Sequence, residues 1–256
     1  MKNKTFMFLM IILFLLLFIA LILIPLHKKV PVKKPQLARG RIAIVIDDWG
    51  YSLKNLLIIE QIKQPLTCAI LPGLKNSNPV MKKLNNLGFE IILHLPMEPK
   101  EKYNLENNTI TSGMDAEAID KIFAKDLSSI TFAKGISNHM GSRITENIKT
   151  STLVMMEAKK RKLYFFDSFV TNQSVCPALA NKIKIRFAKR DVFLDNQNDF
   201  EYIKKQLIKL KNLARKRGTA IGIGHDRKNT LLVLKEMLGQ LEKEGYEFVF
   251  LSQVVR

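Results

Sequence analysis

Short apolar runs alternate with amphipathic stretches from Arg41 to the end of the chain. Runs of this kind, bounded by polar and turn-forming residues, predict buried strands. The expected strands cover residues 42–46, 67–71, 89–94, 135–137, 163–166, 192–194, 219–224 and 248–251. Strands that alternate with helices favour a parallel sheet, either open or closed into a barrel. In both arrangements an active site lies at the carboxyl ends of the strands.

Apolar residues at helical spacing fill several segments between these strands. The pair Asn78-Pro79 is typical of a helix start, and Gly88 of the end of that helix. A second helix is expected to end at Gly218 and a third at Gly245. The apolar faces of these two helices consist of Phe200, Ile203, Leu207, Leu210 and Ala214, and of Leu231, Leu234, Leu238 and Leu241.

The N-terminus has a different pattern, because residues 6–26 are apolar throughout. As a helix, this run would span about 31 Å, close to the bilayer's hydrocarbon core of about 30 Å. No A-x-A cleavage site follows it, so we expect an uncleaved transmembrane anchor over residues 1–27, with a long signal peptide as the alternative. The basic, Pro-containing segment 28–40 is interpreted as a tether that also suits anionic lipid headgroups, and residues 41–256 as one domain.

The formal net charge is +18, from 41 Lys and Arg against 23 Asp and Glu. A basic surface favours nucleic acid, anionic lipid or an anionic wall polymer, and a lysine-rich solvated surface is the plain alternative. The chain has no helix-turn-helix, zinc-finger or RNA-recognition pattern. We therefore expect no nucleic-acid partner, and no motif indicates a specific protein partner.

Three of the four histidines each end an apolar run: His94 in IILHLP, His139 in GISNHMGS and His225 in AIGIGH. The first strand ends in a carboxylate pair, Asp47 and Asp48. A single histidine at a strand end is more often a hydrogen-bonded turn residue, but here all three histidines of the domain share this placement. Adjacent carboxylates would also repel one another without a cation or a proton between them. These residues therefore predict one site at the carboxyl ends of the strands.

An Asp, His, His set suits zinc or another first-row divalent ion and leaves positions open for water and substrate. Such an ion acidifies water and polarises a carbonyl, so the set indicates hydrolysis. Other chemistries have no matching motif. The chain contains no G-x-S-x-G elbow, no P-loop, no G-x-G-x-x-G and no HExxH.

Several further polar residues have two interpretations each. Asp191 and Asp195 bracket the strand at 192–194, and Asp191 either orients a catalytic histidine or pairs with Arg190. Asp167, after the strand at 163–166, is either a site residue or a helix cap. Arg143 either holds an oxyanion or an anionic sugar group, or is a surface arginine.

At these residues the chain resembles the divergent polysaccharide deacetylase family. The matching stretches occur in the family's order and extend over most of residues 41–255. They are IAIVIDDWG, AILPG, EIILHLPMEP, GISNHMGSRIT, YFFDS, RDVFLDN and AIGIGH. The resemblance implies an α/β fold, a distorted (β/α) barrel of about seven strands that follows the N-terminal transmembrane helix. It also implies kinship with metal-dependent carbohydrate esterases.

The resemblance implies a role for each residue of the site. In the better-known deacetylases the first Asp of the pair is the base and the second a metal ligand, which correspond to Asp47 and Asp48. A late Leu-x-His motif supplies the general acid, and His225 matches it by position. The HxxxH-type motif and the R-x-P-Y stretch of those enzymes are absent. Only His94 stands at the first of these motifs, so His139 is the best candidate for the remaining ligand.

The expected activity is the metal-dependent removal of N- or O-acetyl groups from an envelope polysaccharide or glycan. Two alternatives stay open: an inactive, membrane-tethered barrel that binds glycan or metal, and a metal hydrolase for another amide, ester or phosphoester. We expect a single pass through the inner or cytoplasmic membrane with an extracytoplasmic domain, because the implied substrate is an envelope glycan. The lysines after the anchor argue for the opposite orientation.

Overall fold

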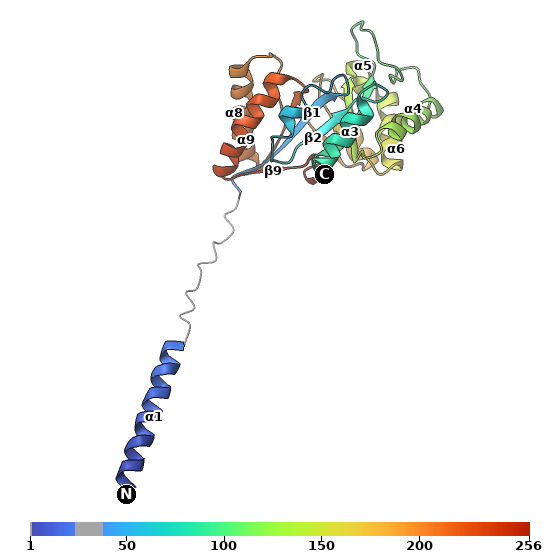
Figure 1. The fold of residues 1–256 in the computed structure, drawn as a ribbon. Helices are drawn as coiled ribbons and strands as arrows, with labels where there is room; N and C mark the ends of the chain where they lie inside the picture. Colours follow the sequence, from blue (N-terminus) through green and yellow to red (C-terminus); the bar gives the residue numbers. More distant parts are fainter. Residues whose placement is uncertain (1, 24–37) are drawn as a thin grey trace. The chain divides into compact units, whose positions relative to one another are not determined.

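The computed structural model describes residues 2–23 and 38–256 (Figure 1). The chain divides into two units between Leu37 and Ala38. Helix α1 (Lys2–Leu23) belongs to the first unit, and its residues Asn3–Ala20 have a mean hydropathy of 2.3 with none of the span buried. This helix is long and apolar enough to cross a membrane, a property that signal sequences share. Most of the expected tether, residues 28–40, lies outside the described residues, so it stays a prediction.

The second unit is built on one parallel sheet of nine strands. The strands are β1 (Gly40–Trp49), β2 (Thr67–Ile70), β3 (Glu90–Met97), β4 (Gly135–Met140), β5 (Tyr164–Asp167), β6 (Phe187–Lys189), β7 (Val192–Phe193), β8 (Thr219–His225) and β9 (Tyr246–Val249). Their order is β6-β5-β4-β3-β2-β1-β8-β7, and β9 pairs with the start of β1. The chain runs directly from β6 at one edge to β7 at the other, so the curled sheet forms a distorted, incomplete barrel. This architecture confirms the expected fold class.

The helices of this unit cover the outside of the sheet. They are α2 (Leu56–Ile59), α3 (Ser77–Asn86), α4 (Ala116–Ser129), α5 (Ser142–Glu146), α6 (Ile148–Lys160), α7 (Cys176–Ile183), α8 (Phe200–Arg217) and α9 (Lys228–Lys243). A short 3₁₀ turn, η1 (Leu251–Gln253), follows β9. Helix α8 packs against β1 and β8, and α9 lies beside α8 and contacts α2 and β9 (Figure 1).

The alternation of side chains along β1 produces two apolar cores. Ile42, Ile44 and Ile46 belong to the larger core, which lies between the sheet and the helices. Ala43 and Val45 belong to the smaller core, which fills the barrel interior. Because successive residues of a strand face opposite sides, the next residue of the inward series is Asp47. The strand therefore directs this carboxylate toward the mouth of the barrel.

The expected elements occur close to the predicted positions, with two differences. Strand β6 was not predicted, since three residues with one exposed side chain carry little apolar signal. Helix α3 begins at Ser77 after Asn76, so Asn78-Pro79 lies inside its first turn. Gly218 ends α8 as expected, with a left-handed φ of 80° that a glycine adopts without steric cost.

Candidate metal centre and catalytic cleft

Both adjacent aspartates lie at the carboxyl end of β1, on the side of the barrel that we call the cleft side. Asp48 has a φ of 64°, and the pairing of β1 with β2 shifts register between Ile46 and Trp49. In a regular strand the side chains of Asp47 and Asp48 would point to opposite faces of the sheet. The left-handed conformation of Asp48 turns the backbone, so both side chains lie on the same side. This conformation is strained for a residue other than glycine, and such strain concentrates at functional sites.

Asp48, His94 and His139 form a compact cluster of possible metal ligands. The Oδ1 atom of Asp48 lies 3.3 Å from Nε2 of His94 and 3.1 Å from Nδ1 of His139. One donor atom from each of the three lies within 4.8 Å of the others, and the two imidazole rings meet edge to face at 5.0 Å. The two histidines come from neighbouring strands, β3 and β4. One carboxylate and two imidazoles that converge in this way fit a single divalent ion of the zinc type.

Supporting residues orient these ligands. Ser137 Oγ lies 2.7 Å from Nδ1 of His94, which leaves Nε2 directed at Asp48. Glu106 Oε1 lies 3.2 Å from Nε2 of His139 and accepts a hydrogen bond of 2.6 Å from the Tyr51 hydroxyl. Partners of this kind fix ring orientation and raise ligand basicity at metal sites. The sequence analysis missed Glu106, because it lies in the loop between β3 and α4, far from any strand end.

The charges of the cluster shift the pKa values in opposite directions. Burial raises the pKa of Asp48, but hydrogen bonds to His139 and His94 outweigh it and hold that pKa well below its ordinary value. Burial lowers the pKa of His139. The hydrogen bond to Asp48 and the charges of Asp48 and Glu106 outweigh this effect, so the pKa is raised overall. Asp48 is therefore ionised throughout the physiological range, which a metal ligand requires.

Asp47 differs from its neighbour in environment. Burial raises the pKa of Asp47, and the nearby imidazoles of His94 and His225 offset only part of that effect. Its Oδ2 lies 3.8 Å from Nε2 of His94, and its buried Oδ1 has no hydrogen-bond partner. A buried carboxylate with a free oxygen and a raised pKa is suited to accept a proton.

His225 lies beside Asp47, because these residues are register partners in β8 and β1. Asp195 Oδ1 lies 2.7 Å from Nδ1 of His225, and Asp195 Oδ2 accepts hydrogen bonds from the His225 backbone N–H and the Thr230 hydroxyl. On one face, the imidazole stacks on Phe193 with ring centroids 5.9 Å apart. Burial lowers the pKa of His225, but the hydrogen bond and charge of Asp195 raise it overall. The imidazole is thus held in one orientation with an increased tendency to carry a proton.

The structure brings together five of the six predicted site residues: Asp47, Asp48, His94, His139 and His225. It does not bring Asp191 to them. The Asp191 carboxylate pairs with Arg217 at 3.1 Å and accepts the backbone N–H of Ile221, so it neither orients His225 nor pairs with Arg190. This corrects the expectation for Asp191. Asp195, at the other end of the same strand, contacts His225 because it lies four residues nearer the carboxyl end of the sheet.

Two other candidates have structural roles in this arrangement. Asp167 accepts hydrogen bonds from the Phe169 backbone N–H and the Ser174 hydroxyl, so it stabilises the turn after β5. Arg143 forms an ion pair of 3.1 Å with Glu98 and donates to backbone carbonyls of the same loop.

Comparison with known proteins identifies relatives of this chain. The model of the divergent polysaccharide deacetylase family matches residues 44–255. The uncharacterized protein YibQ of Escherichia coli strain K12 is 34% identical over 202 residues, which cover 79% of this chain and 63% of that protein. The chain therefore matches less than two thirds of the length of that relative.

Solved structures share the fold. An uncharacterized protein, ATU2773 from Agrobacterium tumefaciens C58, superposes with a TM-score of 0.81 at 24% identity, covering 87% of this chain and 91% of that one. A family 4 carbohydrate esterase from Streptomyces lividans, in complex with acetate, has a TM-score of 0.54 at 13% identity, covering 86% and 97%. A CE4 family pseudoenzyme from Bacillus anthracis has a TM-score of 0.50 at 12% identity, covering 87% and 67%. The extent of the family match and the identity to YibQ show that the chain belongs to the divergent polysaccharide deacetylase family.

Proposed function

We propose that this protein is a metal-dependent hydrolase that removes acetyl groups from an envelope polysaccharide or glycan. One observation carries the proposal. The ligand cluster of Asp48, His94 and His139 lies beside a separate proton acceptor, Asp47, and a separate proton donor, His225. A barrel that only bound a metal or a glycan would need neither of the last two.

The chemistry divides between the ligands and the two flanking residues. A divalent ion held by Asp48, His94 and His139, with zinc the best match to these donors, would supply Lewis acidity toward an acyl carbonyl and water. Asp47 accepts a proton from the attacking water through its unpartnered oxygen. His225, protonated and held by Asp195, donates a proton to the departing nitrogen or oxygen of the sugar. The products are acetate and the free amine or hydroxyl.

The surroundings of the cluster suit a sugar polymer. A hollow lined by Pro99, Tyr103, Met140 and Val170 adjoins His139 through its neighbour Met140. Tyr103 is 59% exposed, and Tyr51, which contacts Glu106 of the cluster, is 53% exposed. The apolar faces of such exposed rings match the faces of pyranose rings.

Amide variants of the two aspartates test the proposal. The protein is loaded with zinc, and metal content, melting temperature and acetate release from acetylated glycan oligomers are measured. Asp48→Asn replaces a charged ligand with a neutral one, so metal affinity falls. Asp47→Asn keeps the ligands and removes the proton acceptor, so turnover falls by about 10²–10⁴-fold while the metal stays bound. Equal metal loss in both variants, or full turnover by Asp47→Asn, contradicts the division of roles.

The substrate assignment has its own controls. Acetylated peptides and phosphoesters are offered to the same zinc-loaded protein. Release from these compounds alone points to the alternative hydrolase, and metal binding without turnover of any substrate points to the inactive binding barrel. Either result overturns the deacetylase proposal.

We also propose that residues 38–256 are anchored and extracytoplasmic, because the proposed substrate is an envelope glycan. Protease added to cells with a permeabilised outer envelope and an intact inner membrane should digest residues 38–256. Complete protection would place this unit in the cytoplasm, as the lysines after the apolar helix suggest by the positive-inside rule.

A further inference from the structure

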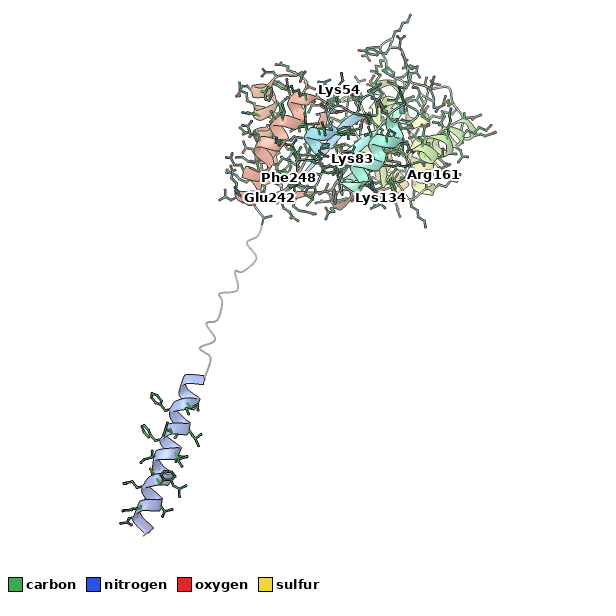
Figure 2. All side chains as sticks on the ribbon, viewed as in Figure 1. Lys54, Lys83, Lys134, Arg161, Glu242 and Phe248 are labelled. Carbon is green, nitrogen blue, oxygen red and sulfur yellow. The ribbon has the colours of Figure 1, made fainter. Side chains whose placement is uncertain are left out.

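The face of the barrel opposite the catalytic cleft is strongly basic. We call it the amino-end face, since all nine strands are parallel and their amino ends meet there. A Lys or Arg stands within four residues before the start of every strand of the described sheet except β3. These exposed bases are Arg39, Lys63, Lys134, Lys162, Lys184, Arg186, Arg215, Lys216, Arg217 and Lys243. Figure 2 shows Lys134 on the opposite side of the unit from Lys54, which follows the carboxyl end of β1.

Acidic residues neutralise only part of this face. Glu60 pairs with Lys83, Asp191 with Arg217, Glu244 with Lys211 and Glu247 with Arg41, and Glu242 accepts a hydrogen bond from the Gln64 amide. In contrast, the side chains of Lys134, Lys162, Lys184 and Lys216 form no ion pair with any residue of the described chain. The amino-end face therefore carries uncompensated positive charge.

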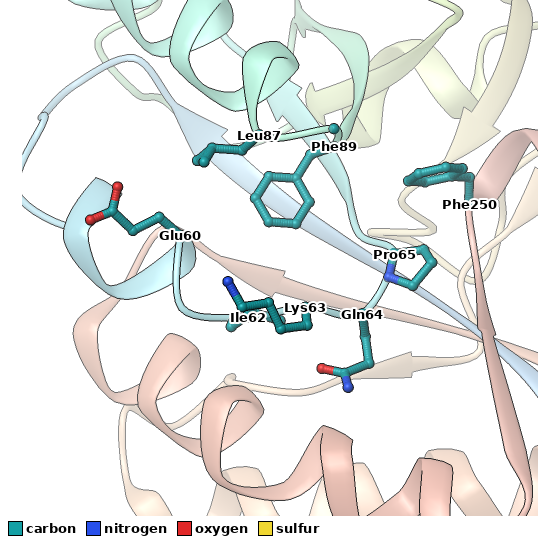
Figure 3. A pocket seen from close by; sticks show the side chains of 9 residues that line it. Glu60, Ile62, Lys63, Gln64, Pro65, Leu87, Phe89 and Phe250 are labelled. Carbon is teal, nitrogen blue, oxygen red and sulfur yellow. The ribbon is translucent and has the colours of Figure 1, made fainter.

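Apolar side chains accompany the bases. Phe132, two residues before Lys134, is 41% exposed. Nearby strands β2 and β3 begin beside a pocket lined by Pro65, Leu87, Phe89 and Phe250, with Lys63 at its side (Figure 3). Aromatic groups mixed with lysines are typical of surfaces that contact the headgroup region of a bilayer.

The covalent connection of the chain also leads to this face. Strand β1 begins there at Gly40, so everything that precedes Ala38 is attached to the amino-end face. Residues 24–37 follow the apolar helix α1 and reach at most about 50 Å at about 3.5 Å per residue. A membrane spanned by α1 would therefore lie within reach of the basic face.

We propose that the amino-end face docks on the anionic phospholipid headgroups of the membrane that α1 spans. Each lysine near such a surface contributes about 1 kcal/mol to the free energy of membrane binding. This corresponds to about a fivefold change in the ratio of docked to undocked protein. The docked orientation directs the catalytic cleft away from the lipid, toward polymer in the adjacent compartment. Nucleic acid is a poorer match, because the bases are spread around a barrel rim with no groove or stacking aromatic ladder between them.

Fluorescence quenching of the full chain in vesicles tests this proposal. The two native cysteines, Cys68 and Cys176, are buried, so a fluorophore is attached at Lys216→Cys on the amino-end face or at Lys54→Cys on the cleft side as the matched control. The vesicles carry headgroup-quencher lipid in either phosphatidylcholine or phosphatidylglycerol. We expect strong quenching at position 216 with phosphatidylglycerol only, and little at position 54 with either lipid. About 1 M salt should abolish the difference, because the Debye length falls to about 3 Å.

Charge removal supplies the second measurement. Replacing Lys134, Lys162 and Lys184 with Gln should lower the docked-to-undocked ratio by about a hundredfold, from about fivefold for each lysine. The matched control replaces three exposed cleft-side lysines, Lys75, Lys149 and Lys228, and should leave the ratio unchanged. Equal quenching at position 216 in both lipids overturns the proposal. A triple variant that retains full docking also overturns it. Binding of an RNA oligonucleotide is measured in parallel, and a triple variant that loses RNA binding while it still docks on vesicles would overturn the proposal as well.

Discussion

The Asp195–His225 pair yields the sharpest prediction for the site. Asp195 is fully buried and accepts three hydrogen bonds, from Nδ1 and the backbone N–H of His225 and from the Thr230 hydroxyl. Asp195→Asn removes the charge that raises the pKa of His225. A hydrogen bond to a charged group contributes about 1.5–3 kcal/mol, and Asp195→Asn takes this contribution away from the protonated imidazole. The pKa of His225 should therefore fall.

The pH dependence of activity follows from that change. A general acid works only while it is protonated, so a raised pKa extends activity to higher pH. In Asp195→Asn the alkaline limb of kcat/KM should move to lower pH. Titration of the His225 ring protons by NMR gives the same quantity independently of turnover.

Asp191→Asn is the matched control, because Asp191 also accepts a backbone N–H and pairs with a base but does not touch His225. Both variants should lose stability, since each leaves a donor without its acceptor at about 1–3 kcal/mol. Only Asp195→Asn should shift the pH profile. An unchanged His225 pKa in Asp195→Asn, or an equal shift in Asp191→Asn, would refute the reasoning.

Three other predictions concern the surroundings of the site and the fold. Glu106→Gln should weaken zinc binding by about 10–100-fold in calorimetry, because a carboxylate that orients His139 is lost; unchanged affinity would contradict that role. Burial raises the pKa of Asp126 to about 6, so ionisation of this carboxyl group destabilises the fold as pH rises from about 4 to 6. The free energy of unfolding of Asp126→Asn, measured by urea titration, should therefore rise relative to the wild type by up to about 3 kcal/mol between pH 4 and 7. A difference that does not depend on pH would refute this. Gly135→Ala would place Cβ 2.4 Å from the Tyr164 ring, so unfolding should become easier by about 1–3 kcal/mol, whereas an unchanged urea midpoint would mean the ring moves freely.

Much of the site follows from local sequence features. Each of Asp47, Asp48, His94, His139 and His225 directly ends or interrupts an apolar run, and parallel strands bring such ends to one edge. The spacing of the apolar runs and the polar residues that end them are therefore sufficient to place these residues together. The same logic predicted the barrel strands, apart from β6, whose three residues are too few to show a pattern.

The tertiary structure decided how these residues are used. The register between β7 and β8 determines that Asp195, and not Asp191, reaches His225, and two carboxylates at the two ends of one short strand look alike in sequence. Glu106 reaches His139 from a loop, where no periodicity constrains the backbone. The left-handed turn at Asp48 separates a buried carboxyl group with a raised pKa, Asp47, from one with a lowered pKa, Asp48, although the two are chemically identical neighbours in the chain. Burial and hydrogen-bond partners set these differences, and both exist only once distant segments have packed together.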